Sequence, residues 1–226
     1  MNYLVTGTDT GVGKTFVTCG LIQAGRALGK QCVGMKPFCT GDLEDVKKIA
    51  VANGYLLPQH RVNPSWFRAP LAPYAAAMVE NRIVDVQGVK ETYSVLAKEF
   101  ESVVVEGAGG LLVPILDHYD FRDLAVEWEL GIVLVVANRL GALNHTLLTI
   151  EAIRKRGLPL KAVILNHVDD SESLAQQTNP GMLTHLLPTS PICLAYGQTD
   201  FGEILRRWSG CRNAGKRRGT AASAAK

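Results

Sequence analysis

The stretch GTDTGVGKT, residues 7–15, carries the most structural information in this sequence. It follows a short apolar run and precedes a long amphipathic segment, so it lies where a strand passes into a helix. Its glycines allow successive backbone N–H groups to turn toward one anion, and the helix N-terminus adds positive potential. Lys14 supplies a mobile cation for the β- and γ-phosphates of a nucleotide, and Thr15 offers a hydroxyl to Mg²⁺. The stretch predicts a phosphate-binding loop.

The loop departs from the strict pattern G-x-x-x-x-G-K-[ST] at one position. That pattern requires glycine at position 8, where this chain has Thr8, and Gly7 lies one residue early. The alternative interpretation is a glycine-rich turn between a strand and a helix that merely exposes Lys14. The position directly after the first strand favours the phosphate loop.

Outward from this loop, short apolar runs rich in β-branched residues alternate with amphipathic stretches. The runs predict buried parallel strands at residues 3–6, 32–35, 102–106, 132–137, 162–166 and 192–194. Helical periodicity appears at 16–28 and 147–154, where Gly29 and Gly157 stop the helices, and Asp120 begins a further helix that runs through Glu129. We therefore expect the α/β class: a single-domain P-loop fold with a mostly parallel sheet flanked by helices on both faces.

Glu106 ends the apolar run 102–106 and is followed at once by Gly107-Ala108-Gly109-Gly110. Ligands of open α/β sheets gather at the carboxyl ends of the strands. An unpaired carboxylate is costly to bury there, and coordination of Mg²⁺ is a sufficient reason for one. The glycine turn lets backbone N–H groups approach a small oxyanion. The alternatives are a solvent-facing strand end and a turn that is glycine-rich for steric reasons only.

Lys36 ends the run 32–35, which reaches the same edge of the predicted sheet. A second lysine beside a phosphate loop stabilises charge that develops during phosphoryl transfer. A lysine at a strand end is just as often a solvated one, so the position alone leaves both interpretations open.

Composition bounds the class of protein. The 226 residues contain 47% hydrophobic and 20% charged residues, which is typical of one globular domain. The net charge of +3 comes from the last residues, which argues against a nucleic-acid-binding face; the basic residues there are Arg206, Arg207, Arg212, Lys216, Arg217, Arg218 and Lys226. We expect a folded domain over 1–208 and a disordered basic tail over 209–226.

The cysteines and the hydropathy pattern indicate the compartment. Five cysteines without a C-x-x-C pair predict neither a disulfide framework nor a zinc site, and this fits a reducing cytoplasm. The sequence has no signal-peptide pattern and no apolar stretch near the ~18–20 residues of a membrane span. We expect a cytoplasmic protein without a membrane partner.

Taken together, the motifs resemble the dethiobiotin synthetase family over about residues 2–200. The resemblance rests on five segments: GTDTGVGKT at 7–15, KP at 36–37 with TG at 40–41, APLAP at 69–73, EGAGG at 106–110 and LGALNHTLLT at 140–149. The first and last are specific in combination, whereas EGAGG is shared with cobyrinate amidase relatives.

The resemblance implies a reaction of 7,8-diaminononanoate with CO2 and ATP, with Mg²⁺ as cofactor. One amine forms a carbamate, the carbamate takes the γ-phosphoryl group as a mixed anhydride, and the second amine closes the ureido ring of dethiobiotin. Lys14 and Lys36 are then the catalytic cations.

The resemblance also implies the remaining ligand contacts. ATP is bound by Asp9, Thr10, Gly11, Val12, Gly13, Lys14, Thr15, Glu106, Gly107, Ala108, Gly109 and Asn166, of which Asn166 reads the adenine. The metal is held by Thr15, Asp45 and Glu106. The diamine and carbamate are bound by Thr10, Lys36, Thr40, Gly109, Gly110 and Asn144.

Two of these assignments keep alternatives. Asp42 and Glu44 lie so close to Asp45 that any of the three can take the metal. Asn144 is implied to begin a helix that meets the substrate carboxylate across a homodimer interface; a residue that merely caps this helix fits the sequence equally well.

Three other classes of protein compete with this interpretation. A regulatory ATPase switch of the same P-loop class usually carries an extra lysine where Asp9 stands. An amide-forming cobyrinate relative needs a further glutaminase domain, for which this chain ends too early. A small-molecule kinase shares Lys14 and Thr15 but has no need of the EGAGG turn.

Overall fold

The computed structural model describes residues 2–198, 201, 202 and 204, and the predicted tail 209–226 lies outside this range. Its centre is a six-stranded sheet in the order β10-β9-β8-β1-β5-β2. All neighbouring strands in it are parallel. The strands are β1 (Tyr3–Gly7), β2 (Cys32–Met35), β5 (Ser102–Gly110), β8 (Gly131–Ala137), β9 (Leu160–Asn166) and β10 (Ile192–Leu194). Every predicted strand is confirmed.

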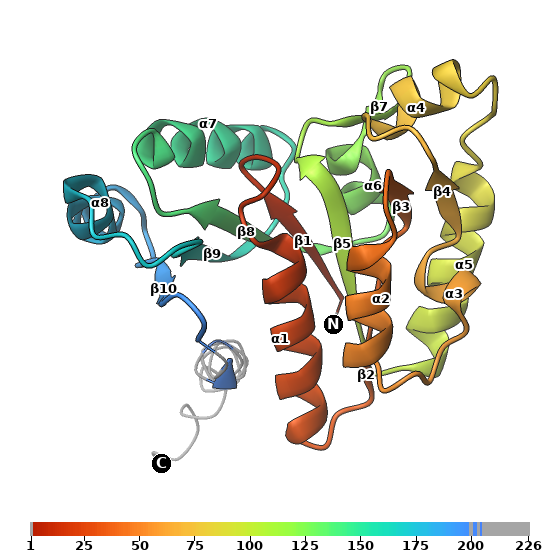
Figure 1. Ribbon diagram of the computed structural model, residues 1–226, viewed down its shortest axis with the longest axis horizontal. Helices are drawn as coiled ribbons and strands as arrows, with labels where there is room; N and C mark the ends of the chain where they lie inside the picture. Colours follow the sequence, from red (N-terminus) through yellow and green to blue (C-terminus); the bar gives the residue numbers. More distant parts are fainter. Residues whose placement is uncertain (1, 199–200, 203, 205–226) are drawn as a thin grey trace, which may run out of the picture.

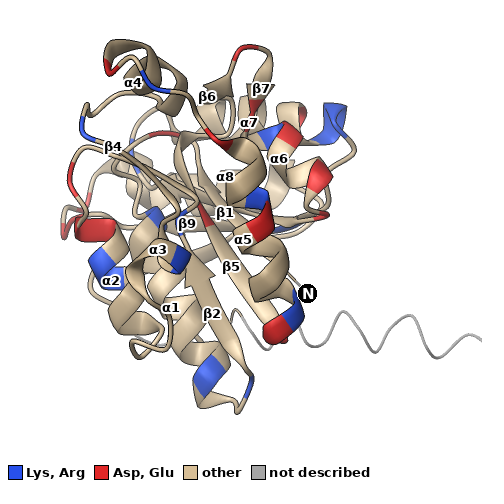
Figure 2. Ribbon diagram, turned by 90° about the vertical axis from the view of Figure 1, so that its right-hand side faces the viewer, with Lys and Arg blue, Asp and Glu red and all other residues tan. Residues whose placement is uncertain are grey.

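Helices cover both faces of this sheet, as predicted. α1 (Lys14–Ala27) and α2 (Glu44–Ala52) lie on one face, and α5 (Val86–Glu99), α6 (Phe121–Glu127) and α7 (Ala142–Lys155) lie on the other (Figures 1 and 2). α8 (Leu174–Leu186) packs beside α7. On the side drawn in Figure 2, acidic and basic residues are interspersed.

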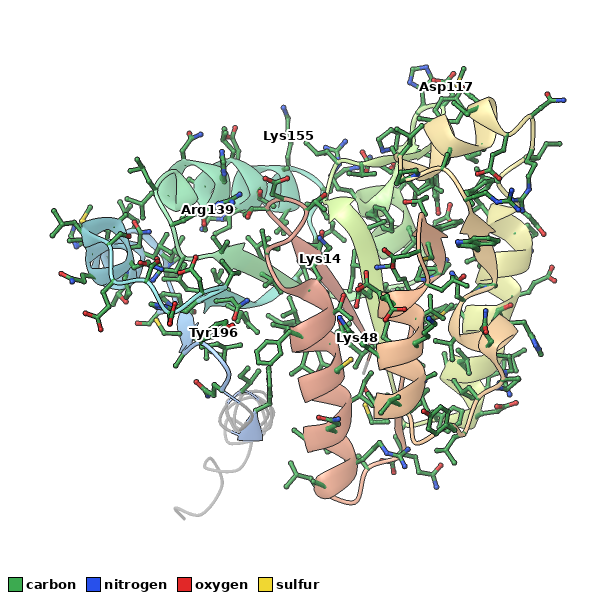
Figure 3. The ribbon with its side chains drawn as sticks, in the orientation of Figure 1. Lys14, Lys48, Asp117, Arg139, Lys155 and Tyr196 are labelled. Carbon is green, nitrogen blue, oxygen red and sulfur yellow. The ribbon has the colours of Figure 1, made fainter. Side chains whose placement is uncertain are left out.

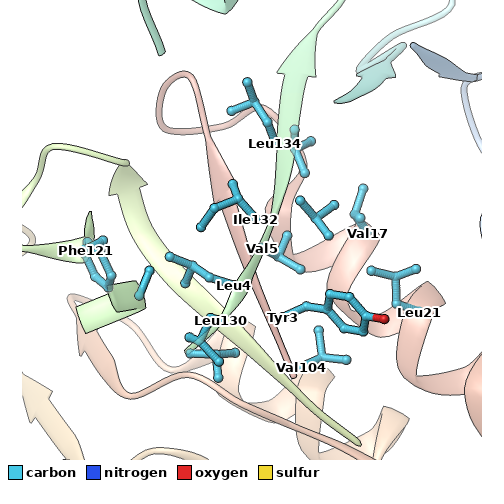
Figure 4. Close-up of a cluster of buried hydrophobic side chains, with 14 of the residues drawn as sticks. Tyr3, Leu4, Val5, Val17, Leu21, Val104, Phe121, Leu130, Ile132 and Leu134 are labelled. Atoms are coloured by element: carbon cyan, nitrogen blue, oxygen red, sulfur yellow. The ribbon is translucent and has the colours of Figure 1, made fainter. Parts of the chain in front are cut away.

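The hydrophobic core lies between these layers and is built around β1. Tyr3 and Val5 point toward Val17 and Leu21 of α1, while Leu4 points to the opposite face, toward Phe121 of α6 (Figure 4). This alternation is the period of two that a strand buried on both faces requires. The core therefore fixes the end of β1, where the phosphate loop begins.

The predicted helix ends are largely confirmed. Gly29 and Gly157 have φ values of 75° and 66°, the left-handed conformation that ends helices, and they follow α1 and α7. Asp120 caps α6 in a reciprocal capping box with Asp123. The prediction that this helix runs through Glu129 is wrong: α6 ends at Glu127, and Glu129 has a positive φ of 52°.

Smaller elements complete the fold at the carboxyl edge of the sheet. A parallel pair, β3 (Phe38–Thr40) and β4 (Ser65–Phe67), extends the connection after β2, together with α3 (Gln59–Val62). α4 (Pro73–Val79) follows, and a hairpin of β6 (Pro114–Leu116) and β7 (Tyr119–Asp120) leads from β5 to α6. None of the helices in the described part of the chain combines the length and the hydropathy of a membrane span.

Candidate nucleotide and phosphoryl-transfer site

The phosphate loop connects β1 to α1, and glycines define its course. Gly11 and Gly13 have φ values of 74° and 96°, and Gly13 is the N-cap of α1. A Cβ at Gly7 would lie 2.7 Å from Val12 Cγ2 and 3.2 Å from Lys14 Nζ. Gly7 thus meets a steric need within the loop, which explains why glycine stands one position earlier than in the strict motif.

Lys14 folds back over the loop that carries it. Its Nζ donates to the Asp9 carbonyl at 2.9 Å, and the side chain is largely buried. This burial lowers the pKa of Lys14 to about 8, against the opposing attraction of Glu106. A lysine held inside the curl of the loop is placed to meet the terminal phosphates of a nucleotide.

Lys36 lies at the centre of an ionic cluster in which Lys36 and Glu106 are buried and Asp45 is partly exposed. Its Nζ is 2.6 Å from Glu106 Oε1 and 2.7 Å from Asp45 Oδ2, and Thr15 Oγ1 donates to Glu106 Oε1 at 2.9 Å. The strand register explains the first contact, since Met35 of β2 pairs with Val105 of β5 and the next residues are Lys36 and Glu106. The two predicted catalytic cations and the three predicted metal ligands therefore converge on one edge of the sheet.

Charge in this cluster is set by the ion pairs. Burial alone would lower the pKa of Lys36, but the carboxylates of Glu106 and Asp45 outweigh it and raise the pKa above its ordinary value. Burial would likewise raise the pKa of Asp45, and the attraction of Lys36 reverses this and lowers it. Lys36 is consequently an ammonium, and Asp45 a carboxylate, at neutral pH.

The residues present fit Mg²⁺. Glu106 is fully buried, and its Oε2 has no hydrogen-bond partner in the part of the chain that the structure describes. The Thr15 hydroxyl and the Asp45 carboxylate lie beside it. Mg²⁺ takes oxygen ligands and is commonly held by one or two carboxylates together with substrate phosphates. The described residues contain no group of three acidic, histidine or cysteine side chains suited to a metal, so phosphates would have to complete the coordination.

A cleft of about 740 Å³ opens over the loop and the cluster. Lys14 at the start of α1 and Lys48 on α2, both labelled in Figure 3, line this cleft. Of the predicted residues, its lining includes Thr10, Gly11, Gly13, Lys14, Thr15, Lys36, Thr40, Asp45, Ala108 and Gly109. A side chain at Gly109 would come within 2.8 Å of Val113 and 3.7 Å of Thr10 Oγ1, so glycine keeps the cleft open.

The acidic residues after Gly41 separate into different roles. Asp45 alone contacts Lys36, whereas Glu44 pairs with Lys47 and Asp42 accepts from the Glu44 backbone N–H. All three line the cleft. Their contacts favour Asp45 as the ligand that stands beside Glu106.

Asn166 ends β9 and touches the phosphate loop from the other side. Its Nδ2 donates to the Val12 carbonyl at 3.0 Å, and its buried Oδ1 has no partner among the described residues. One N–H of the amide is thus committed to the loop. The amide oxygen therefore has the capacity for a further hydrogen bond.

The predicted residue Asn144 is not part of this cleft. The N-cap of α7 is Gly141, and Asn144 is an exposed residue of the first turn. The interpretation of Asn144 as the helix cap is therefore wrong. Gly110 lines a separate hollow of about 370 Å³, which Leu112, Leu148 and Thr149 also line.

Comparison with known proteins assigns the family. An AAA domain family matches residues 1–194. ATP-dependent dethiobiotin synthetase BioD of Anaeromyxobacter dehalogenans (strain 2CP-C) is 40% identical over 206 residues, which cover 89% of this chain and 92% of that protein. The Akkermansia muciniphila protein of the same name is 41% identical over 80% of this chain and 85% of its own length. This chain belongs to the dethiobiotin synthetase family.

Structural neighbours of this family member share the fold but little sequence. A putative plasmid partition protein from Borrelia burgdorferi B31, solved with AMPPNP, superposes with a TM-score of 0.54 at 11% identity and covers 93% of this chain and 98% of its own. The signal recognition particle receptor FtsY from Elizabethkingia anophelis gives 0.53 at 14% identity, over 92% of this chain and 64% of its own. These neighbours confirm the α/β P-loop architecture.

Sequence reasoning did not assign a role to several residues of the dethiobiotin synthetase site. Pro70, Leu71, Ala72 and Pro73 line the cleft, and the sequence points to the segment APLAP only through the family resemblance. Lys48 lies one turn after Asp45 on α2 and adds a cation to the same cleft. Neither feature has a local motif, because both depend on how β3, β4 and α2 fold over the sheet edge.

Proposed function

We propose that this protein forms dethiobiotin from 7,8-diaminononanoate, CO2 and MgATP in the cytoplasm. The observation that carries the proposal is the convergence of Lys14, Lys36 and Glu106 beside the glycine turn 107–110. This arrangement suits the transfer of a phosphoryl group to a small anion. Membership of the dethiobiotin synthetase family supplies the chemistry of that anion.

Membership of the dethiobiotin synthetase family implies the order of the chemical steps. One amine of the diamine adds to CO2 and loses a proton, which gives a carbamate. A carbamate oxygen attacks the γ-phosphorus and ADP leaves. The second amine then attacks the carbonyl carbon of the mixed anhydride, expels phosphate and loses a proton, which closes the ring. The carbamate, the triphosphate and the released phosphate are all anionic. Fixed cations are therefore the main requirement of the site.

The side chains divide this task by position. Lys14 meets the β- and γ-phosphates from within the loop. Lys36, held as an ammonium between Glu106 and Asp45, faces the transferring group and the carbamate. Thr15, Asp45 and Glu106 would hold Mg²⁺, which when bound neutralises phosphate charge. Thr10, Thr40 and the backbone of Gly109 line the end of the cleft where the diamine would lie.

A homodimer is part of the proposal. Leu148 and Leu112 are 57% and 53% exposed and line the hollow that Gly110 also lines, and Leu140, which is 87% exposed, lies two residues before α7. Exposed leucines that gather at one hollow favour a protein interface over water. A second copy seated there would bring the N-terminus of one α7 toward the substrate end of the other cleft, where its free N–H groups suit a carboxylate.

One assay tests the reaction. Purified protein is incubated with MgATP, bicarbonate and the diamine, and the product is sought by mass spectrometry. Dethiobiotin in amounts equal to the ADP formed is the expected result. ATP loss that does not depend on the diamine, without this product, would contradict the proposal and favour a regulatory ATPase.

A further inference from the structure

A buried asparagine, Asn138, lies directly after β8 and has no role in the site described above. Its side chain is fully buried and uses both ends of its amide. Nδ2 donates to the Gln176 carbonyl at 2.9 Å and lies 2.9 Å from His167 Nε2, while Oδ1 accepts from Asn179 Nδ2 at 2.9 Å. Asn138 thus joins the ends of β8 and β9 to α8.

Residues next to this network in the sequence contact the phosphate loop. His167 follows Asn166, which donates to the Val12 carbonyl, and the backbone N–H of Asn138 donates to the Asn166 carbonyl at 2.8 Å. Asn166, at the end of β9, therefore holds the loop at Val12, and the backbone of Asn166 is itself bound to the backbone of Asn138.

A second contact reaches the loop from the other neighbour. The Arg139 guanidinium lies 3.2 Å from Asp9 Oδ2, and the Arg139 carbonyl accepts from Asn179 Nδ2 at 3.1 Å. Arg139 and Lys14 lie at the same end of the sheet (Figure 3). The loop is thus contacted at Asp9 and Val12, and both contacts come from residues that the Asn138 network holds in place.

We propose that Asn138 is a positioning residue for nucleotide binding. It touches no nucleotide atom itself; it fixes the segments that carry Arg139 and Asn166 so that the phosphate loop keeps its binding conformation. The inference rests on the proposed function only in that the loop binds a nucleoside triphosphate.

Removal of the Asn138 side chain has a defined physical consequence. The Asn179 amide and the Gln176 carbonyl would each lose a partner in the protein interior, and the half-buried His167 Nε2 would lose one as well. Buried polar groups without partners are costly, and members of a connected network depend on one another. The ends of β8 and β9 would therefore shift to regain partners, and the contacts at Asp9 and Val12 would shift with them.

Asn53 provides a matched control. It is an equally buried asparagine, and its side chain accepts from Gly34 N at 2.7 Å and donates to Gly34 O at 2.9 Å, between α2 and β2. It does not line the nucleotide cleft. Asn53→Ala therefore removes the same type of buried amide without touching the loop.

The test compares Asn138→Ala, Asn179→Ala and Asn53→Ala with the unmodified protein by calorimetric titration with MgAMPPNP and by thermal unfolding. All three substitutions should lower Tm. We expect the Kd for MgAMPPNP to rise at least tenfold for Asn138→Ala and Asn179→Ala, and to stay within twofold for Asn53→Ala. In turnover, the KM for ATP should rise while the KM for the diamine stays unchanged.

Each outcome of this test either supports or overturns the proposal for Asn138. A Kd within twofold of the unmodified value in Asn138→Ala, with a lowered Tm, would make Asn138 merely structural and overturn the proposal. If Asn138→Ala does not fold, Asn179→Ala is judged by the same criterion. If the unmodified protein binds no MgAMPPNP, the proposed function fails together with this inference; normal binding with unaffected variants overturns this inference alone.

Discussion

Lys36 Nζ lies 2.6 Å from Glu106 Oε1, where two neighbouring parallel strands end side by side. The same carboxylate is the one proposed to hold Mg²⁺. Lys36 therefore balances the charge of Glu106 and Asp45. Mg²⁺ held by the same two carboxylates would add a second positive charge beside Lys36.

Replacement of Lys36 should affect both rate and stability. In Lys36→Met we expect kcat to fall by about 10²–10³, the usual effect of removing one preorganised group that stabilises transition-state charge. The substitution also removes the ammonium that pairs directly with the buried Glu106, so Tm should fall and MgADP should restore more of it than in the unmodified protein. Steady-state kinetics and thermal unfolding measure the two effects. Near-normal kcat at saturating substrates would show that Lys36 does not face the reacting atoms.

Asp45 should matter more for Mg²⁺ than its acidic neighbours. Asp45→Asn should raise the Mg²⁺ concentration needed for half-maximal activity by at least about tenfold, because the charge of one of two proposed carboxylate ligands is lost. Asp42→Asn and Glu44→Gln serve as matched controls and should change it little. An equal effect of all three substitutions would indicate a general acidic field in place of a defined ligand.

Nucleotide binding should depend on pH through Lys14. Its pKa is lowered to about 8 by burial, and the triphosphate should raise this pKa when it binds. Above pH 8 the free protein has then lost a proton that the complex retains, so binding takes up a proton and weakens by up to about tenfold per pH unit. Below pH 8 this dependence disappears. Calorimetry in buffers with different ionisation enthalpies measures the uptake, and its absence at pH 9 would contradict the assignment.

Gly20 should be intolerant of alanine. A Cβ at this position of α1 would clash with the ring of Phe201, which also packs edge-on against Phe16 with ring centroids 5.3 Å apart. We expect Gly20→Ala to lower the free energy of unfolding by about 1–3 kcal/mol. Gly181→Ala in α8, where nothing lies within 4 Å of the new Cβ, is the control and should be neutral or slightly stabilising. A stabilising effect of Gly20→Ala would show that Phe201 does not occupy this place.

The dimer prediction depends on the exposed leucines. Leu148→Glu should convert the protein to a monomer in sedimentation experiments and raise the KM for the diamine, because each substrate end would lose the partner's helix. Leu174→Glu is the control: this leucine of α8 is 78% exposed and does not line the hollow at Gly110. A monomeric unmodified protein with full activity would remove the homodimer from the proposal.

Much of the fold could be predicted because its signals are local. The run 3–6, the glycine loop and the period of 16–28 specify a strand, a turn and a helix within one continuous stretch. The sequence also indicates that Lys36 and Glu106 reach the same edge of the sheet, since both follow apolar strands. Their contact depends on the pairing of β2 with β5, and these two strands lie far apart in the sequence.

The features that could not be predicted depend on contacts between distant segments. Asp42, Glu44 and Asp45 differ only in the direction that the start of α2 gives them, and β3 and β4 set that direction. Asn138 follows an apolar strand as any loop residue does, and only the folding of α8 against it shows its network. Contacts between such distant segments produce no local sequence pattern from which they could be predicted.

The central place of β1 has a consequence for how the molecule loses order. β1 is paired on both sides, to β5 and β8, whereas β10 is a three-residue edge strand in the order of the described sheet. Fraying begins at edges, where fewer hydrogen bonds must break. Mild heat or a trace of protease should therefore reach β10 and its neighbour β9 first. In such a partly opened molecule Asn166 would release the Val12 carbonyl, and the phosphate loop would lose its contact with β9.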